Sequence, residues 1–118
     1  MKGQNFLKRL KYAVDGISVA FFREKSFRFH LLAGIGVLLT LWITESSTMW
    51  WALSIVTIGL VIIAELFNSA LETLMDHIHP HQHKEIGVAK DIAAGGVLIA
   101  TIVAIVVAVA FIFDKIHR

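Results

Sequence analysis

The stretch Ala64–Asp76, AELFNSALETLMD, follows directly on the apolar run Trp50–Ile63, and the rest of the chain is arranged around it. Polar side chains interrupt it at intervals of three or four residues: Glu65, Asn68, Glu72 and Asp76. On a helix of about 3.6 residues per turn, these intervals place the four side chains on one face. We therefore expect a polar stripe, made of these four residues, that begins inside an apolar helix and continues beyond its end.

Glu65 lies at the inner end of the polar stripe, with apolar neighbours on both sides. An ionisable side chain inside a membrane-like segment is expensive to bury and marks a candidate functional site. The alternative is that Glu65 has only a structural role, as an acid paired with a neighbouring helix. A carboxylate in apolar surroundings accepts a proton readily, so Glu65 is the best candidate for a general base.

The composition indicates a membrane protein. Of 118 residues, 57% are hydrophobic, and the mean hydropathy is +0.74, which is too apolar for an ordinary soluble domain. No cysteine is present, so disulfides and thiolate metal sites are excluded. Seven of the eleven Lys and Arg residues precede the first long apolar run, where contact with anionic lipid is a better explanation than nucleic-acid binding.

The hydrophobic pattern predicts an all-α, three-span membrane protein with an additional amphipathic helix at the membrane surface. One domain covers residues 1–118, and its length of 118 residues suits a single domain. The expected elements are the amphipathic helix at about 3–24 and spans at about 29–49, 49–67, continuing as a helix to 76, and 92–113.

The distribution of basic residues predicts the topology. Seven of them precede the first span: Lys2, Lys8, Arg9, Lys11, Arg23, Lys25 and Arg28. The loop between the second and third spans contains Lys84 and Lys90, whereas the segment Thr44–Thr48 contains no Lys or Arg. The positive-inside rule then places the N-terminus and the polar stripe on the cytoplasmic side.

The outer part of the polar stripe suits phosphate chemistry with a divalent cation. Glu72 offers oxygen ligands of the kind that Mg²⁺ prefers, although it could also be a solvated helix residue. Asn68 could orient a phosphate or the base, or form a hydrogen bond to a neighbouring helix. Asp76 could support the site, or be a solvated or capping residue.

Lys90 and Asp91 open the third span. Lys90 can contact phosphate as a point charge. Asp91 is either part of the same site or the N-cap of the third helix. The chain has neither Gly-x-x-x-x-Gly-Lys-Ser/Thr nor Gly-x-Gly-x-x-Gly, so phosphate binding would need a scaffold other than a P-loop or a Rossmann fold.

The segment His77–His83 contains four alternating histidines. They would share a face only in an extended chain, and Pro80 disfavours a helix there. Imidazole suits zinc, copper or nickel, but no acidic or cysteine partner lies beside them, so we expect an exposed loop that binds metal incidentally. A rival interpretation of the chain, a non-enzymatic metal-ion permease or sensor, would use this loop together with the polar stripe.

The stretch from Glu65 to Asp76 closely resembles the signature of the prokaryotic diacylglycerol kinase family, which includes the undecaprenol kinases. The segment Ala89–Gly95, AKDIAAG, also matches the family, and so does Glu24 with Phe27 and Arg28. The resemblance extends over nearly the whole chain. It implies a small integral-membrane lipid kinase that works as a homotrimer, with active sites shared between subunits.

The resemblance also implies roles for individual residues. Glu65 would be the general base, and Glu24 and Glu72 would hold Mg²⁺ with ATP. Around the phosphates or the nucleotide would lie Asn68, Lys90 and Asp91, with Asp76 in support. The His-rich loop departs from the family pattern, so its contacts with nucleotide are not carried over.

The lipid substrate follows from smaller motifs. Phe29–Ala33, FHLLA, and Asp91–Gly95, DIAAG, are more similar to the undecaprenol kinase branch than to the enterobacterial diacylglycerol kinase branch. We therefore expect phosphorylation of undecaprenol to undecaprenyl phosphate at the bacterial cytoplasmic membrane. Diacylglycerol, giving phosphatidate, is the alternative within the same class, and no nucleic-acid partner is expected.

Overall fold

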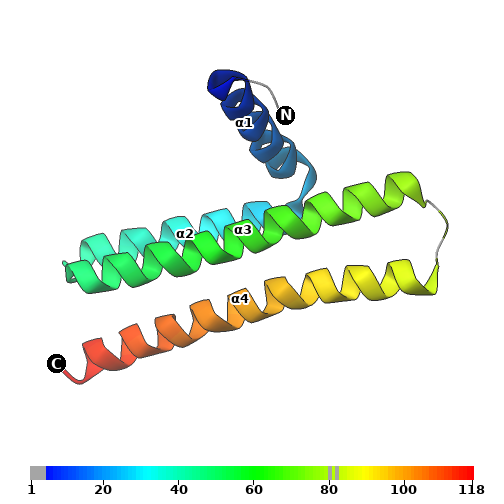
Figure 1. The fold of residues 1–118 in the computed structure, drawn as a ribbon. Coiled ribbons are helices and arrows are strands. Elements are labelled where there is room, and N and C mark those ends of the chain that lie inside the picture. The colour runs from blue at the N-terminus through cyan, green and yellow to red at the C-terminus, as the bar shows by residue number, and fades with distance from the viewer. Residues whose placement is uncertain (1–4, 80, 82) are drawn as a thin grey trace.

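The computed structural model describes residues 5–79, 81 and 83–118, which form four helices and no strand (Figure 1). The helices are α1 (Phe6–Arg23), α2 (Lys25–Ile43), α3 (Thr48–Ile78) and α4 (Lys84–Ile116). The predicted all-α class is confirmed.

Helix α1 begins at Asn5, whose side chain accepts a hydrogen bond from the backbone N–H of Lys8 at 2.9 Å. It projects away from the other three helices (Figure 1). Large apolar side chains on it are exposed, including Phe6 at 73% and Phe22 at 76%. An amphipathic helix whose large apolar side chains are exposed suits the membrane interface.

Helix α2 packs closely against α3. Its buried residues are Phe27, Gly34 and Leu41, which recur every seven residues and so share a face. A Cβ at Gly34 would lie 3.1 Å from Ile58 Cγ2, which is tighter than ordinary packing. Glycine therefore lets the two helices approach at this point, as in other membrane helix pairs.

A tight turn of residues 44–47 joins α2 to α3. Ser46 N–H donates to Leu41 O at 3.0 Å, and Glu45 N–H donates to Trp42 O at 3.2 Å, the two bonds of a Schellman motif. Glu45 has φ of 50°, the left-handed region that this motif requires and that usually holds glycine. The first predicted span, α2, therefore ends at Ile43 rather than near residue 49.

Helix α4 lies antiparallel beside α3 and makes no backbone approach to α2 (Figure 1). None of its residues is buried in the described chain. A hollow of about 470 Å³ lies between the three long helices, lined mainly by apolar and small side chains. Much of α4 is therefore free to contact lipid or another protein.

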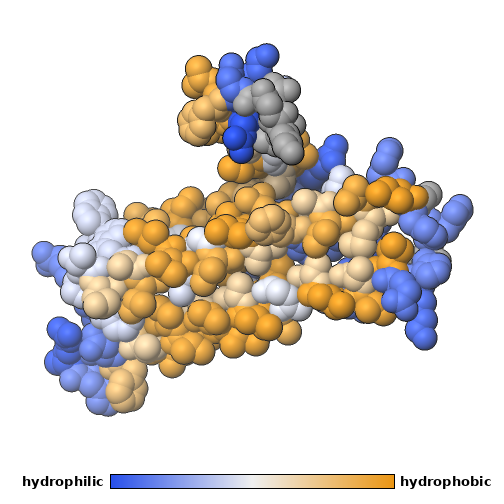
Figure 2. Space-filling model, in the orientation of Figure 1, coloured by the Kyte–Doolittle hydropathy of each residue, from blue (hydrophilic) through white to orange (hydrophobic). Residues whose placement is uncertain are grey.

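Helices α2, α3 and α4 are each long and apolar enough to cross a membrane. Figure 2 shows a mainly apolar surface along their length and hydrophilic residues gathered at both ends. At a rise of about 1.5 Å per residue, the 31 residues of α3 extend about 46 Å, against a hydrocarbon core of about 30 Å. The outer part of α3 therefore extends well beyond the core.

Candidate active site

The polar stripe lies on one uninterrupted helix, because α3 continues to Ile78. Asn68 Nδ2 donates to Glu72 Oε1 at 3.3 Å, as expected for side chains one turn apart on the same face. Eleven residue steps separate Glu65 from Asp76, or about 16 Å along the axis. The stripe therefore reaches from the buried part of α3 to its exposed end.

Glu65 is buried, with 6% of its surface exposed, and it faces α2. Ser26 Oγ donates to Glu65 Oε1 at 2.6 Å, and His30 Nδ1 lies 2.7 Å from the same oxygen. Glu65 therefore has both features considered from the sequence: it is a buried acid, as a general base would be, and it is paired with a neighbouring helix. Polar partners are what a buried carboxylate needs to be tolerated.

Glu24 lies at the junction of α1 and α2, and the fold turns its carboxylate toward α3. Ser69 Oγ donates to Glu24 Oε1 at 2.9 Å. Arg28 Nη1 donates to the main-chain oxygens of Phe21 at 2.7 Å and Phe22 at 3.2 Å, so its guanidinium satisfies free carbonyls at the end of α1. This arrangement fixes the junction that carries Glu24.

Glu24 and Glu72 in this region are carboxylates of the kind that could hold Mg²⁺. Glu24 bonds to Ser69, and Glu72 lies one turn further along α3 from Ser69. Asn68 Oδ1 is buried and has no hydrogen-bond partner among the described residues, so it can still accept one. Mg²⁺ is commonly held by one or two carboxylates, with substrate phosphates and water completing its octahedral shell.

Lys90 and Asp76 connect α4 to the end of the polar stripe. Lys90 Nζ donates to Asp76 Oδ1 at 2.5 Å, and 35% of the lysine side chain is exposed. Asp91 is exposed and lies inside α4, two turns after its start. The interpretation of Asp91 as an N-cap is therefore wrong: His83 caps the helix, accepting at Nδ1 from the N–H of Glu85 at 3.1 Å.

The His-rich loop is shorter than the sequence indicated. His77 belongs to α3, and α4 already begins at Lys84. His79 Nδ1 lies 2.8 Å from the main-chain oxygen of His81. Pro80, on which part of the interpretation of the loop rested, lies outside the described residues. Among the residues that the structure describes, no group of three His, Asp or Glu side chains could hold a metal ion.

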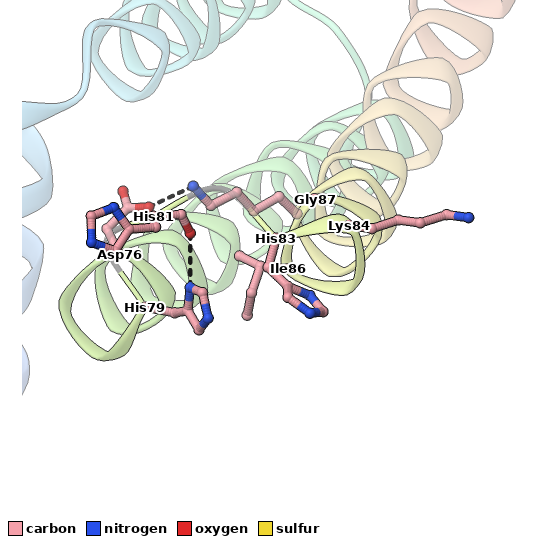
Figure 3. A pocket seen from close by; sticks show the side chains of 8 residues that line it. Asp76, His79, His81, His83, Lys84, Ile86 and Gly87 are labelled. Atoms are coloured by element: carbon pink, nitrogen blue, oxygen red, sulfur yellow. Dashed lines mark hydrogen bonds and ion pairs between the residues drawn. The ribbon is translucent and has the colours of Figure 1, made fainter.

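A hollow of about 360 Å³ lies between this loop and the start of α4 (Figure 3). Its lining includes Asp76 and Lys90, and Figure 3 shows the Lys84 side chain extending away from Asp76. The lining contains two lysines against one aspartate, together with three histidines. It can receive a group of negative charge beside the outer end of the polar stripe.

Sequence reasoning assigned no role to Ser26 or His30. The two residues are four positions apart on α2, and so lie on one face of that helix. Their partner, Glu65, is distant in the chain, and periodicity does not report which helix faces which. The available signal was a histidine at the edge of an apolar run.

Comparison with known proteins identifies the family. The family model described as prokaryotic diacylglycerol kinase matches residues 11–112. The chain is 36% identical over 104 residues to a diacylglycerol kinase of Synechocystis, covering 87% of this chain and 59% of that longer protein.

Two other relatives are covered over most of their length. An undecaprenol kinase of Bacillus subtilis is 30% identical over 110 residues, covering 93% of this chain and 89% of that protein. A diacylglycerol kinase of Escherichia coli K12 is 35% identical over 103 residues, covering 85% and 82%. With its three membrane-length helices, the chain is a bacterial membrane protein. It belongs to the prokaryotic diacylglycerol kinase family, whose members are phosphotransferases with an alcohol group as acceptor.

Proposed function

We propose that this lipid kinase transfers the γ-phosphate of Mg-ATP to the hydroxyl of undecaprenol. The observation that carries the proposal is the buried carboxylate of Glu65 on a membrane-length helix. It is held on one oxygen by polar side chains of α2, and no described residue bonds to its other oxygen, Oε2. Such a carboxylate can take a proton from a hydroxyl that arrives through the bilayer.

The depth of Glu65 supports a lipid acceptor. Trp50 is a suitable anchor for the other membrane interface, since its Nε1 donates to Asp114 Oδ2 at 3.2 Å at the end of α4. Fifteen residue steps from Trp50 to Glu65 correspond to about 22 Å, within a core of about 30 Å. Glu72, about 33 Å from Trp50, lies beyond that thickness. A lipid hydroxyl can therefore reach Glu65 while ATP stays in water.

The transfer needs one proton acceptor and an in-line approach. Glu65 Oε2 takes the hydroxyl proton as the lipid oxygen bonds to the γ-phosphorus and the bond from that phosphorus to the leaving oxygen of ADP breaks. Positioning and charge neutralisation supply most of the catalysis in such reactions. The product is the phosphorylated lipid.

The phosphates of ATP are assigned to the outer part of the site. Glu24 and Glu72 would hold Mg²⁺, which when bound neutralises charge on the phosphate oxygens. Asn68 keeps a free acceptor oxygen beside Glu72. The remaining assigned residues are Lys90 and Asp91 near the nucleotide, with Asp76 holding Lys90.

Undecaprenol is the proposed acceptor, and diacylglycerol is the alternative. Relatives named for either lipid match this chain over similar lengths, so identity does not select between them. The FHLLA motif of Phe29–Ala33, which resembles the undecaprenol kinase branch, supports the choice. His30 of that motif contacts the proposed base directly.

Assembly and orientation are part of the proposal. A homotrimer would cover the faces of α4 that a single chain leaves exposed and would complete sites shared between subunits. The basic N-terminal segment supports a cytoplasmic N-terminus and a cytoplasmic site. The C-terminus would lie outside, since Figure 1 shows it beside the α2–α3 turn and at the opposite end from the His-rich loop.

The test is ATP-dependent phosphorylation by the purified protein in detergent micelles, with undecaprenol and diacylglycerol offered separately. We expect radiolabelled phosphate in the undecaprenol product at a higher kcat/KM than in phosphatidate. A higher kcat/KM with diacylglycerol would overturn the choice of lipid. No product from either lipid would overturn the kinase assignment and favour the non-enzymatic alternative.

A further inference from the structure

Helix α2 brings two polar side chains to the carboxylate of Glu65. Ser26 and His30 are one helical turn apart, and each lies within 2.7 Å of Glu65 Oε1. The histidine side chain is 19% exposed and the glutamate side chain 7%. This cluster spans α2 and α3 and is distinct from the phosphate end of the polar stripe.

The two contacts differ in kind. Ser26 donates a regular hydrogen bond to Glu65, whereas His30 Nδ1 is buried and lies close without the alignment of a regular hydrogen bond. The imidazole therefore constrains the carboxylate by its position beside Oε1. Both contacts are to Oε1, and among the described residues none is to Oε2.

We propose that His30 is a positioning residue for the phosphorylation of the lipid hydroxyl. The inference rests on the proposed function, in which Glu65 is the base. His30 and Ser26 hold Oε1 against α2, so that Oε2 is turned to the acceptor hydroxyl. A carboxylate without these partners would rotate among several orientations, and a misplacement of about 1 Å can cost about 10²-fold in rate.

The chemistry stays that of the proposed function. The proton of the hydroxyl passes to Glu65 Oε2, the lipid oxygen bonds to the γ-phosphorus, and ADP leaves with the electron pair of the broken bond. His30 touches neither the lipid nor the phosphate in this scheme. Its effect is on the orientation of the base, and therefore on kcat rather than on the affinity for ATP.

Two substitutions separate positioning from packing. His30→Leu keeps most of the volume and removes the polar atom, while His30→Asn keeps a nitrogen near the place of Nδ1. We expect His30→Leu to lower kcat about 10- to 10²-fold, with the KM for Mg-ATP changed less than about twofold. His30→Asn should recover most of that loss.

The matched control is Ile35→Leu on the same helix. Ile35 is 54% exposed and lies outside the FHLLA motif. Its substitution should leave kcat near the wild-type value. A His30→Leu variant with normal kcat would overturn the inference, and so would equal losses in His30→Leu and His30→Asn together with a lower thermal midpoint in both.

A spectroscopic measurement gives a readout that does not depend on turnover. In ¹⁵N-histidine-labelled protein, with the His30 signals assigned by their loss in His30→Asn, Glu65→Gln should shift the His30 imidazole resonances and Glu72→Gln should not. Unchanged resonances in Glu65→Gln would overturn the inference. If the wild type phosphorylates no lipid, the proposed function fails. If it does, and Glu65→Gln is inactive while His30→Leu is normal, only the role of His30 fails.

Discussion

Lys90 Nζ and Asp76 Oδ1 lie 2.5 Å apart and join the start of α4 to the end of α3. Both residues line the hollow between the His-rich loop and the start of α4. Because Asp76 is 64% exposed, solvent weakens the attraction, and the lysine can turn to an incoming phosphate at little cost. The pair holds the lysine ammonium beside the proposed phosphate end of the site.

Removal of the Lys90 ammonium should weaken the binding of ATP. We expect Lys90→Ala to raise the KM for Mg-ATP about 10- to 10²-fold, the value of a lost charge-assisted hydrogen bond. Lys90→Arg keeps the charge and should lose less. Steady-state kinetics with ATP varied at saturating lipid measure both.

The control for this experiment is Lys115→Ala, because Lys115 lies in the last turn of α4, at the other end of that helix from Lys90. Asp76→Asn should raise the KM for Mg-ATP by a smaller factor. In a Lys90→Ala background it should not raise this KM further, because the proposed role of Asp76 is to hold Lys90. An unchanged KM in Lys90→Ala would contradict the assignment.

Substitution of the base should act on kcat. Glu65→Gln keeps the size and the polar contacts with α2 but cannot take a proton, so kcat should fall about 10²- to 10⁴-fold. The KM for Mg-ATP should stay close to the wild-type value. Steady-state kinetics of the purified variant measure kcat and KM. The control is Glu85→Gln, because Glu85 is an exposed residue of α4. Retention of normal turnover by Glu65→Gln would rule out its role as base.

The two proposed cation ligands should share one phenotype. Glu24→Gln and Glu72→Gln each remove a carboxylate charge, so each should raise the Mg²⁺ concentration needed for half-maximal activity, by about tenfold or more. Titration of Mg²⁺ at fixed ATP measures this. The Mg²⁺ dependence of Glu85→Gln should match the wild type, and wild-type titrations in both ligand variants would show that the carboxylates act elsewhere.

Glu45 provides a prediction about stability. Its φ of 50° is unfavourable for a residue with a side chain, by about 1–2 kcal/mol, and glycine avoids this at an entropic cost of about 0.5–1 kcal/mol. Glu45→Gly should therefore raise the thermal midpoint in detergent, whereas Glu45→Ala keeps the Cβ and should not. A lower midpoint in Glu45→Gly would contradict this.

The parts of the fold that follow from periodicity were predictable. The polar stripe from Glu65 to Asp76 requires only that α3 stay helical, and it does. The first turn was harder to place, because Glu45 stands where a Schellman motif usually shows glycine, and no such signal marked the helix end. The start of α4 was hard to place for a similar reason, because its N-cap is His83 and histidine is an unusual N-cap residue.

The site depends on contacts between helices, which periodicity does not report. The sequence singled out Glu65 and Lys90 by their surroundings, and the structure pairs each with a residue of another helix. It offered no way to know that α2 would turn His30 to Glu65, or that Ser69 would meet Glu24. Only the packing of α2 on α3, together with the junction that carries Glu24, brings these residues together.

The unbroken course of α3 couples the site to the thickness of the bilayer. Glu65 and Asp76 stand on one helix, so neither can change its depth without the other. A thicker or thinner bilayer is accommodated by tilt of the helix or by deformation of the lipid around it, each at a modest cost per ångström of mismatch. The acyl-chain length of the surrounding lipids thereby sets how far the base lies from the headgroup plane in which an acceptor hydroxyl resides.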